Sequence, residues 1–125
     1  MKAVIITAIG RGFCAGFDLQ AVTAAGQYPK QNEMLEHFDN KLNSTVRLIK
    51  DMAKPVVMAV NGIAAGAGVG LALAGDLVLM ADTANFRLVF LPQLGIAPDM
   101  GGSWFLPRIL GRTRALEILF TGRPI

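Results

Sequence analysis

Residues 54–76 read KPVVMAVNGIAAGAGVGLALAGD, and this stretch indicates the fold class. Its apolar, β-branched run at 56–60 is typical of a short buried strand. An Asn-Gly pair then marks a turn, and the small residues at 64–75 predict a glycine-rich loop that feeds a short helix. A further strand is expected at 76–80, with Asp76 as a hydrogen-bond acceptor at its start. Such alternation of strand and helix is typical of the α/β class.

Outward from this stretch, hydrophobic periodicity and turn residues predict the remaining elements. The clearest is a helix at 32–51, whose apolar residues recur at spacings of three and four and form one stripe. Before the opening stretch we expect a strand at 3–8, a break at 10–12, and a turn at 13–19 in which Asp18 caps a short helix from Leu19. After it we expect extended or irregular chain at 86–91, a loop at 95–102, and helices at 103–110 and 112–120. Pro107 is expected to bend or interrupt its helix.

The composition fits one globular domain. The chain has 125 residues, and 53% hydrophobic with 17% charged residues excludes a disordered tail. Its mean hydropathy of +0.47 is high, which indicates a membrane segment or a surface that neighbouring polypeptide covers. A single cysteine and a single histidine, Cys14 and His37, exclude an internal disulfide and a Cys/His metal cluster, so no metal site is expected.

Two other interpretations attach to the glycine-rich stretch. Residues 55–75 carry no charge, and Gly62, Gly66 and Gly70 lie four residues apart, in the pattern of packed membrane helices. A small membrane-associated protein is therefore a competitor, although the Asn-Gly turn and the β-branched run before it weigh against a span. A dinucleotide-binding fingerprint fails, because Leu71 occupies the position where glycine or alanine must let the helix approach the strand.

The net charge of +3 reflects basic residues in the second half of the chain, which are Arg87, Arg108, Arg112, Arg114 and Arg123. They predict either a solvated basic face or a surface that favours an anionic ligand such as a nucleotide phosphate. Aromatic residues do not interleave with them, so nucleic acid is not expected as a partner.

Two glycine-rich turns, each after a predicted buried strand, are candidates for chemistry. They are Ala15-Gly16-Phe17 and Gly66-Ala67-Gly68. Small residues let a ligand approach the backbone, and the second turn opens a helix whose first N–H groups lack internal partners. Two converging N–H groups would form an oxyanion hole, in which one donor is typically worth about 3 kcal/mol in the transition state. A role in packing alone is an equal alternative for these glycines.

In order along the whole chain, three groups of motifs resemble the signatures of the crotonase family, also called the enoyl-CoA hydratase/isomerase family. They are Arg11 to Leu19; Lys54 to Gly62 with Ala65 to Gly68 and Leu71 to Asp76; and Leu94 to Ser103 with Leu106-Pro107-Arg108 and Thr121-Gly122. Jointly these motifs are highly specific. The stretch from Gly62 to Asp76, with Pro98 to Gly102, most resembles the epoxyphenylacetyl-CoA isomerase group of the family.

The resemblance implies a fold and a substrate. Family members form a spiral of ββα turns with two perpendicular sheets, assemble as trimers or dimers of trimers, and stabilise the enolate of an acyl group carried as a coenzyme A thioester. We therefore expect this spiral, a homotrimer or hexamer in full-length form, and no cofactor beyond the coenzyme A of the substrate. A cytoplasmic protein is expected, since the apolar run at 3–7 is too short and too β-branched for a signal-peptide core.

The resemblance also assigns site residues. The backbone N–H groups of Phe17 and Ala67 correspond to the oxyanion-hole donors, although many members have glycine at the position of Ala67. The residues expected to line the substrate site are Ala15, Gly16, Gly66, Gly68, Phe90 and Trp104.

Carboxylates separate the reactions of the family. Its hydratases use two glutamates, at the positions of Gly70 and Phe90, and this chain has neither. Asp99 is then the expected catalytic residue, since one carboxylate can move a proton as base and then as acid, for an acceleration of about 10²–10⁴-fold. The resemblance therefore favours an isomerase over a hydratase.

The surroundings of Asp99 allow two roles. An apolar pocket around Phe17, Phe90 and Trp104 is expected to raise its pKa toward a useful range. The alternative is a helix cap before Ser103.

Family members carry further strands and a helix before the position of Met1, and further helices after Ile125. Residues 1–125 are therefore expected to form a partial core domain, truncated at both ends. In that case we expect the strand at 3–8 to lack sheet neighbours, apolar faces to lie open, and the isolated chain to be poorly soluble. A remnant that keeps the fold but not the activity is the alternative function.

Overall fold

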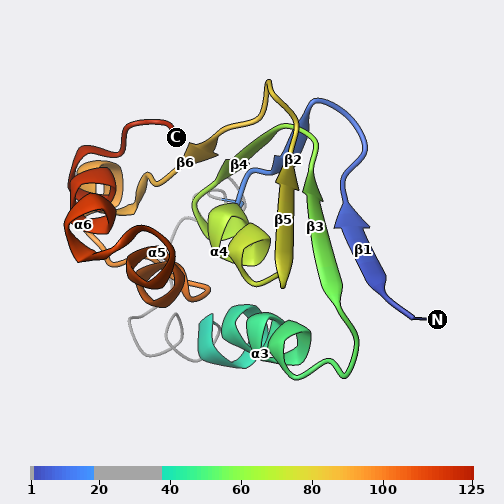
Figure 1. Ribbon diagram of the computed structural model, residues 1–125. Coiled ribbons are helices and arrows are strands. Elements are labelled where there is room, and N and C mark those ends of the chain that lie inside the picture. Colours follow the sequence, from blue (N-terminus) through green and yellow to red (C-terminus); the bar gives the residue numbers. More distant parts are fainter. Residues whose placement is uncertain (1, 19–37) are drawn as a thin grey trace.

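Six short strands form two parallel sheets in the computed structural model, which describes residues 2–18 and 38–125 (Figure 1). The first sheet has the strand order β1-β3-β5 and the second the order β2-β4-β6. The strands are β1 (Val4–Thr7), β2 (Gly12–Cys14), β3 (Val56–Val60), β4 (Ile63–Ala65), β5 (Leu77–Met80) and β6 (Phe86–Arg87). Parallel neighbours cannot be joined by tight hairpins, so the chain crosses over between them.

Successive strands alternate between the two sheets, and helical segments follow each pair of strands. These segments are the π-helical turn η1 (Phe38–Asn43) and α3 (Ser44–Lys50), then α4 (Ala67–Leu73), and finally the π-helical turn η2 (Phe90–Leu94), α5 (Gly102–Leu110) and α6 (Arg112–Thr121). In Figure 1 the second sheet lies across the upper end of the first. The repetition is the expected ββα spiral, and the α/β class is confirmed.

One face of the first sheet packs inward and the other is open. Val56, Met58 and Val60 of β3 are buried. Side chains alternate across a strand, so the residues between them point the other way. On the neighbouring strands Ile5 is 70% exposed and Leu79 is 55% exposed, which confirms the expected open apolar face.

Strand β1 lies at an edge of this sheet but is not isolated. It pairs with β3 over its whole length, from Val4 opposite Val56 to Thr7 opposite Ala59. The N–H of Val4 also donates to the carbonyl oxygen of Pro55 at 2.9 Å. The expectation that the strand at 3–8 lacks sheet neighbours is therefore wrong, because β3 supplies one.

Helix α4 lies at the centre of the molecule, beside β2, β3 and β4 and against α5 (Figure 1). Six of its seven residues are buried, because its small side chains let neighbouring backbone come close. The uncharged stretch at 55–75 is divided among β3, β4 and α4, so its interpretation as one membrane span is wrong. Within the described residues, every helix is too short or too polar to cross a membrane.

Most predicted elements are present. The strand at 56–60 is β3, and the helices at 103–110 and 112–120 correspond to α5 and α6. Pro107 lies inside α5 and does not interrupt it, and the left-handed Gly122 ends α6. The helix predicted at 32–51 is described from residue 38 as η1 and α3. Its first part, His37 and the short helix from Leu19 lie outside the described residues.

Two strands were not predicted. β2 lies where a break and a turn were expected, and β4 lies where a glycine-rich loop was expected. Each has three residues and pairs only with strands distant in sequence.

Candidate active site

The two glycine-rich turns meet at one point of the fold. Strands β2 and β4 pair in parallel, which brings the chain that follows each of them to the same end of the second sheet. A Cβ atom placed on Gly16 would lie 2.7 Å from the carbonyl oxygen of Ala65 and 3.2 Å from the nitrogen of Ala67. Gly16 also has a φ of +87°, so this close contact suits glycine alone. The segments that carry Phe17 and Ala67 are therefore adjacent.

A sharp backbone reversal at Gly66 begins α4. Gly66 has φ +53° and ψ −125°, and its N–H donates to the carbonyl oxygen of Arg87 in β6 at 3.0 Å. Ala67 and Gly68 are the first helical residues, and the N–H groups of a first turn have no acceptor within their own helix. The helix start thus presents the N–H of Ala67 beside Gly16, where the sequence places an oxyanion-hole donor.

The residues predicted to line the substrate site divide into packed and open ones. Phe90 is 5% exposed, and the tip of its ring would lie 3.7 Å from a Cβ on Gly66. Gly68 packs directly on the backbone of Cys14 in β2. Ala15 and Phe17 are exposed, Phe17 to 37%. Phe90 and Gly68 therefore support the turns, whereas Ala15 and Phe17 are open to a ligand.

Asp99 lies in the tight turn before α5. Its Oδ1 atom is buried and has no hydrogen-bond partner among the described residues. Burial raises the pKa of Asp99 from 3.8 to about 6, and a hydrogen bond from its own backbone opposes this rise. The N-cap of α5 is Gly101, and no side chain caps this helix, so the alternative role as a helix cap before Ser103 is wrong.

Met100 docks the Asp99 turn onto α4. Its side chain is 5% exposed, and its φ of +46° is uncommon for a residue other than glycine. A Cβ atom on Gly70 would lie 2.6 Å from both the Cβ and the carbonyl oxygen of Met100. Gly70 comes three residues after Ala67, which is about 4.5 Å along a helix axis. One short helix therefore places the acid-bearing turn close to the Ala67 N–H.

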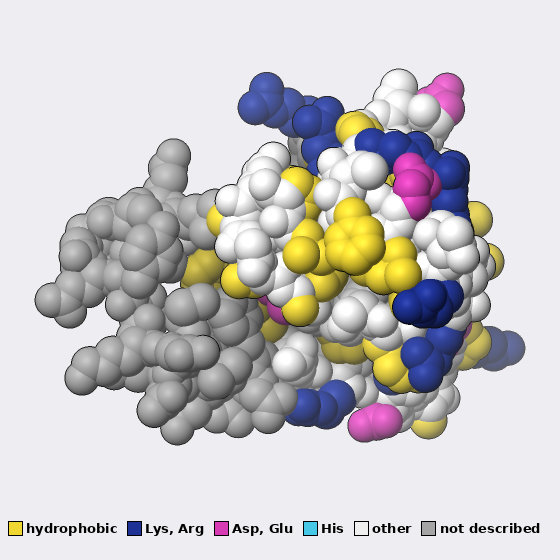
Figure 2. All heavy atoms as spheres, turned by 90° about the vertical axis from the view of Figure 1, so that its left-hand side faces the viewer, with side chains coloured by type: hydrophobic (Ala, Val, Ile, Leu, Met, Phe, Trp, Pro, Cys, Tyr) yellow, Lys and Arg dark blue, Asp and Glu magenta, His cyan; other side chains and the backbone are white. Residues whose placement is uncertain are grey.

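Trp104 stands on the open side of α5. Its ring is 52% exposed, the Arg108 guanidinium carbon lies 3.9 Å from the ring centre, and Phe105 meets it edge to face at 5.1 Å. Figure 2 shows the face on the α6 side, where hydrophobic side chains gather with Lys and Arg side chains around them. Trp104 is therefore about half exposed, and Phe17 is exposed to a smaller extent.

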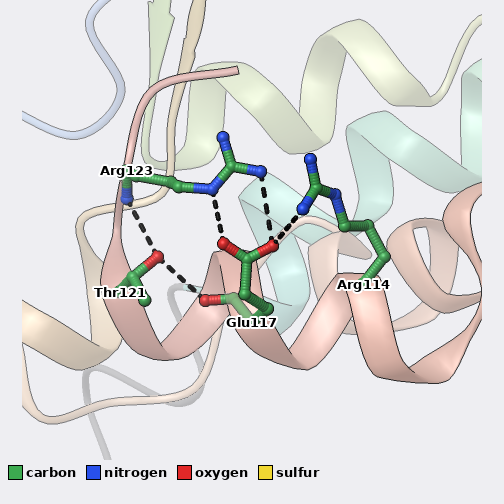
Figure 3. A network of polar contacts seen from close by, with 4 residues as sticks. All are labelled: Arg114, Glu117, Thr121 and Arg123. Atoms are coloured by element: carbon green, nitrogen blue, oxygen red, sulfur yellow. Dashed lines mark hydrogen bonds and ion pairs between the residues drawn. The ribbon is translucent and has the colours of Figure 1, made fainter.

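Glu117 of α6 is a carboxylate of the opposite kind (Figure 3). It accepts hydrogen bonds from Nε and Nη2 of Arg123 and, at 2.6 Å, from Nη1 of Arg114. The hydrogen bond from Arg123 and the charges of both arginines hold the pKa of Glu117 below its usual 4.5. Thr121 Oγ1 donates to the Glu117 carbonyl oxygen at 2.9 Å and accepts from the Arg123 N–H at 3.3 Å. Glu117 is therefore a structural anchor for the chain after α6.

Asp76 is also structural, as expected. Its Oδ2 accepts the N–H of Val56 at 2.9 Å and its Oδ1 accepts from Lys50 Nζ at 3.1 Å. These hydrogen bonds, that of Val56 first, lower the pKa of Asp76. They join the starts of β3 and β5 to the end of α3.

Most basic residues of the second half have partners on their own chain. Besides the two arginines on Glu117, Arg87 Nε donates to Asn85 Oδ1 at 3.1 Å and Arg108 Nη1 donates to the carbonyl oxygen of Trp104 at 3.0 Å. This favours a structural basic face.

A shallow hollow of about 490 Å³ at the start of α6 is lined by none of the predicted site residues. Across 2–18 and 38–125, no three His, Cys, Asp or Glu side chains gather as they would around a metal ion.

The contact between Gly70 and Met100 was missed from the sequence. The available signal was a methionine between an aspartate and two glycines, in a turn where positive φ is usually left to glycine. That signal indicates backbone strain at Met100, but it does not show that Met100 contacts Gly70 of α4.

Comparison with known proteins identifies the family. The family model described as enoyl-CoA hydratase/isomerase matches residues 1–125. The chain is 44% identical over 127 aligned residues to the 1,2-epoxyphenylacetyl-CoA isomerase of Escherichia coli K12, covering 100% of this chain and 47% of the relative. It is 36% identical to a 4-chlorobenzoyl coenzyme A dehalogenase of an Arthrobacter species, covering 98% and 44%.

A solved structure agrees. The crystal structure of an enoyl-CoA hydratase from Polaromonas sp. JS666 superposes with a TM-score of 0.89 at 39% identity, covering 100% of this chain and 48% of that one. The chain thus spans about half the length of the relatives it matches. With the ββα spiral and the motif positions described above, these matches show that the chain belongs to the enoyl-CoA hydratase/isomerase family.

Proposed function

We propose that the protein acts on an acyl group carried as a coenzyme A thioester, and that it is an isomerase which moves one proton through an enolate with Asp99 as the proton carrier. The observation that carries this proposal is the state of the Asp99 carboxyl group. Its Oδ1 is buried and has no hydrogen-bond partner in the described part of the chain, and its pKa is raised to about 6. Such a group can take up and release a proton near neutral pH.

In this mechanism the backbone binds the thioester. The carbonyl oxygen of the thioester would accept hydrogen bonds from the N–H groups of Phe17 and Ala67. These two residues lie on the two turns that meet at Gly16. The open Ala15 would let the thioester reach the backbone. Donors fixed in place before the reaction stabilise the negative charge as it develops on the oxygen.

Asp99 then moves the proton. The carboxylate takes a proton from one carbon of the acyl chain, and the electron pair of that C–H bond passes into the enolate. The protonated Asp99 exchanges its carboxyl proton with solvent, and the enolate then collapses and takes a proton from Asp99 at another carbon of the conjugated chain, which restores the Asp99 carboxylate and shifts the double bond. Atoms and electrons balance without water, metal or redox cofactor, so one carboxylate suffices.

Two features support an isomerase over a hydratase. Adding water needs one group to activate the water and another to protonate carbon. Phe90 carries no acid, and any side chain at Gly70 would enter the backbone of Met100. The names of the relatives, which include an isomerase and a dehalogenase, also allow chemistry other than hydration.

The same proposal includes the assembly. The full-length protein would be a cytoplasmic homotrimer or hexamer. Either a second subunit or the flanking segments of the full-length chain would cover the open apolar face with Ile5 and Leu79.

Deuterium uptake tests the proposed function. The protein is incubated with an enoyl-CoA in D₂O, and uptake at the α and γ carbons is followed by NMR. We expect uptake that falls by about 10²–10⁴-fold in Asp99→Asn. A hydrated product would make it a hydratase. Absence of uptake from a folded protein that still binds the thioester would favour the alternative, a remnant without activity.

A further inference from the structure

We propose that Gly70 is a positioning residue for Asp99: because it has no side chain, Met100 can dock on α4 and hold the Asp99 carboxyl group in its buried place, which keeps the site to a single carboxylate. This inference rests on the proposed function for its chemistry. Its geometry stands independently of that function.

The contact at Gly70 is made by the backbone and the Cβ atom of Met100, which a change of side-chain rotamer cannot move away. A Cβ at this position would come within 2.6 Å of the Cβ and carbonyl oxygen of Met100 and 3.0 Å of its carbonyl carbon. Gly70 lies in the middle of α4, where alanine would be the better helix former. The fit against Met100 therefore explains the glycine better than helix geometry does.

The docked turn has little freedom to adapt. Met100 and Gly101 both have positive φ, at +46° and +78°. The Gly102 N–H donates to the Asp99 carbonyl oxygen at 2.9 Å, and a Cβ on Gly102 would lie 3.0 Å from the Cβ of Pro98. Displacing Met100 from α4 therefore displaces its neighbour Asp99.

Displacement should change what Asp99 can do. Burial is what raises the pKa of this carboxyl group. If the turn moves outward, water reaches Oδ1, the pKa falls toward its ordinary range, and the carboxylate becomes a weaker base that is also further from the substrate. A longer acid at position 70 meets the same obstacle, since its Cβ would already lie within the Met100 backbone.

The experiment measures the Asp99 pKa and the isomerase activity separately. Carboxyl-carbon NMR follows the Asp99 titration in wild type, Gly70→Ala and the double variant Gly70→Ala with Met100→Gly. Deuterium exchange with enoyl-CoA gives kcat and KM for the same proteins. Gly12→Ala is the matched control, because its new Cβ would meet only the Ile63 carbonyl oxygen at 3.6 Å, an ordinary contact.

We expect Gly70→Ala to lower the Asp99 pKa by at least one unit and kcat by at least tenfold, with KM changed less than threefold. Glycine at position 100 removes the Cβ contact and tolerates positive φ, but the contact with the carbonyl oxygen remains, so the double variant should recover part of both losses. An unchanged pKa and kcat in Gly70→Ala, or equal losses in Gly12→Ala, would overturn the inference.

The remaining outcomes are also decisive. If Gly70→Ala does not fold, a folded double variant with an Asp99 pKa near 6 supports the inference, and an unfolded double variant overturns it. If the wild type shows no exchange, the proposed function fails, while the NMR titration still decides whether Gly70 positions Asp99.

Discussion

Asp99 and Glu117 are carboxylates on neighbouring segments that the fold treats in opposite ways. Asp99 precedes α5, has a buried Oδ1 without a partner among the described residues, and has a pKa raised to about 6. Glu117 lies on α6, is paired with Arg114 and Arg123, and has a pKa below its usual value. The first can exchange a proton near neutral pH, whereas the second stays ionised.

The contrast shows how the fold gives one carboxylate the properties that catalysis needs and gives the other a structural role. A partly buried acid without a countercharge among the described residues carries an unfavourable desolvation energy, and its place must be fixed by other contacts, here the docking of Met100 on Gly70. An acid that fixes chain geometry is surrounded by cations. Changes on the Asp99 side should therefore alter activity most, and changes on the Glu117 side should alter only stability.

After Asp99→Asn, the largest effect on activity is expected from Ala67→Pro. Proline is tolerated at the first position of a helix, so this change removes the proposed oxyanion-hole N–H without breaking α4. Loss of one such donor should lower kcat for deuterium exchange by about 10²–10³-fold. Ala67→Gly keeps the N–H and is the control. Equal activity in both variants would contradict a role for this N–H.

The pH profile of exchange should show Asp99 titrating and Glu117 not. A base must be ionised, so kcat/KM should rise through a pKa of about 6 and fall about tenfold per unit at lower pH, reaching about 100-fold by pH 4. Glu117→Gln should leave this profile unchanged. A wild-type profile that is flat between pH 4 and 7 would exclude Asp99 as the base.

Much of the fold was predictable from short sequence patterns. The two strands that were not predicted were missed for one physical reason. The β-branched run at 56–60 and the helices α5 and α6 have local signals long enough to recognise. Strands β2 and β4 have three residues each, and Ile63–Ala65 is rich in small residues, so their sequence resembles a loop. Their strand geometry comes from pairing with each other across more than forty residues and of β4 with β6 across more than twenty, which no local pattern contains.

For the candidate site, the resemblance supplied residues that stay predictions, and the contact that holds the Asp99 turn was not predicted. The resemblance named Phe17, Ala67 and Asp99, and the rise in the Asp99 pKa was predicted in direction. Burial is the leading cause of this rise, as expected, and of the three aromatic residues expected around Asp99 only Phe90 is itself buried. The contact of Gly70 with Met100 joins residues on a helix and a distant turn, and only tertiary structure reveals it.

Asp99→Asn is expected to have a smaller effect on the free energy of unfolding. Asp99 has a folded-state pKa above its unfolded value of 3.8, so its favourable contribution is present below pH 3.8 and is lost as pH rises through about 6. Asparagine never ionises. We therefore compare the unfolding free energy of Asp99→Asn with that of wild type at two pH values. After a discount for partial exposure, the variant should be more stable relative to wild type at pH 8 than at pH 4, by about 1–2 kcal/mol. Urea unfolding at both pH values measures this, and a loss at pH 8 would contradict it.

The smallest effect is expected for Glu117→Gln. The lowered pKa means that the carboxylate stabilises the fold above its unfolded pKa of 4.5, and that this contribution is lost as pH falls through the folded pKa. The partners are exposed, so the melting temperature should fall only slightly at pH 7. The difference from wild type should shrink in acid and in 1 M salt, where screening weakens exposed ion pairs. A difference that persists in salt would show that hydrogen-bond geometry, rather than charge, holds Arg123 and the chain after α6. Loss of deuterium exchange in this variant would remove the distinction between the two carboxylates.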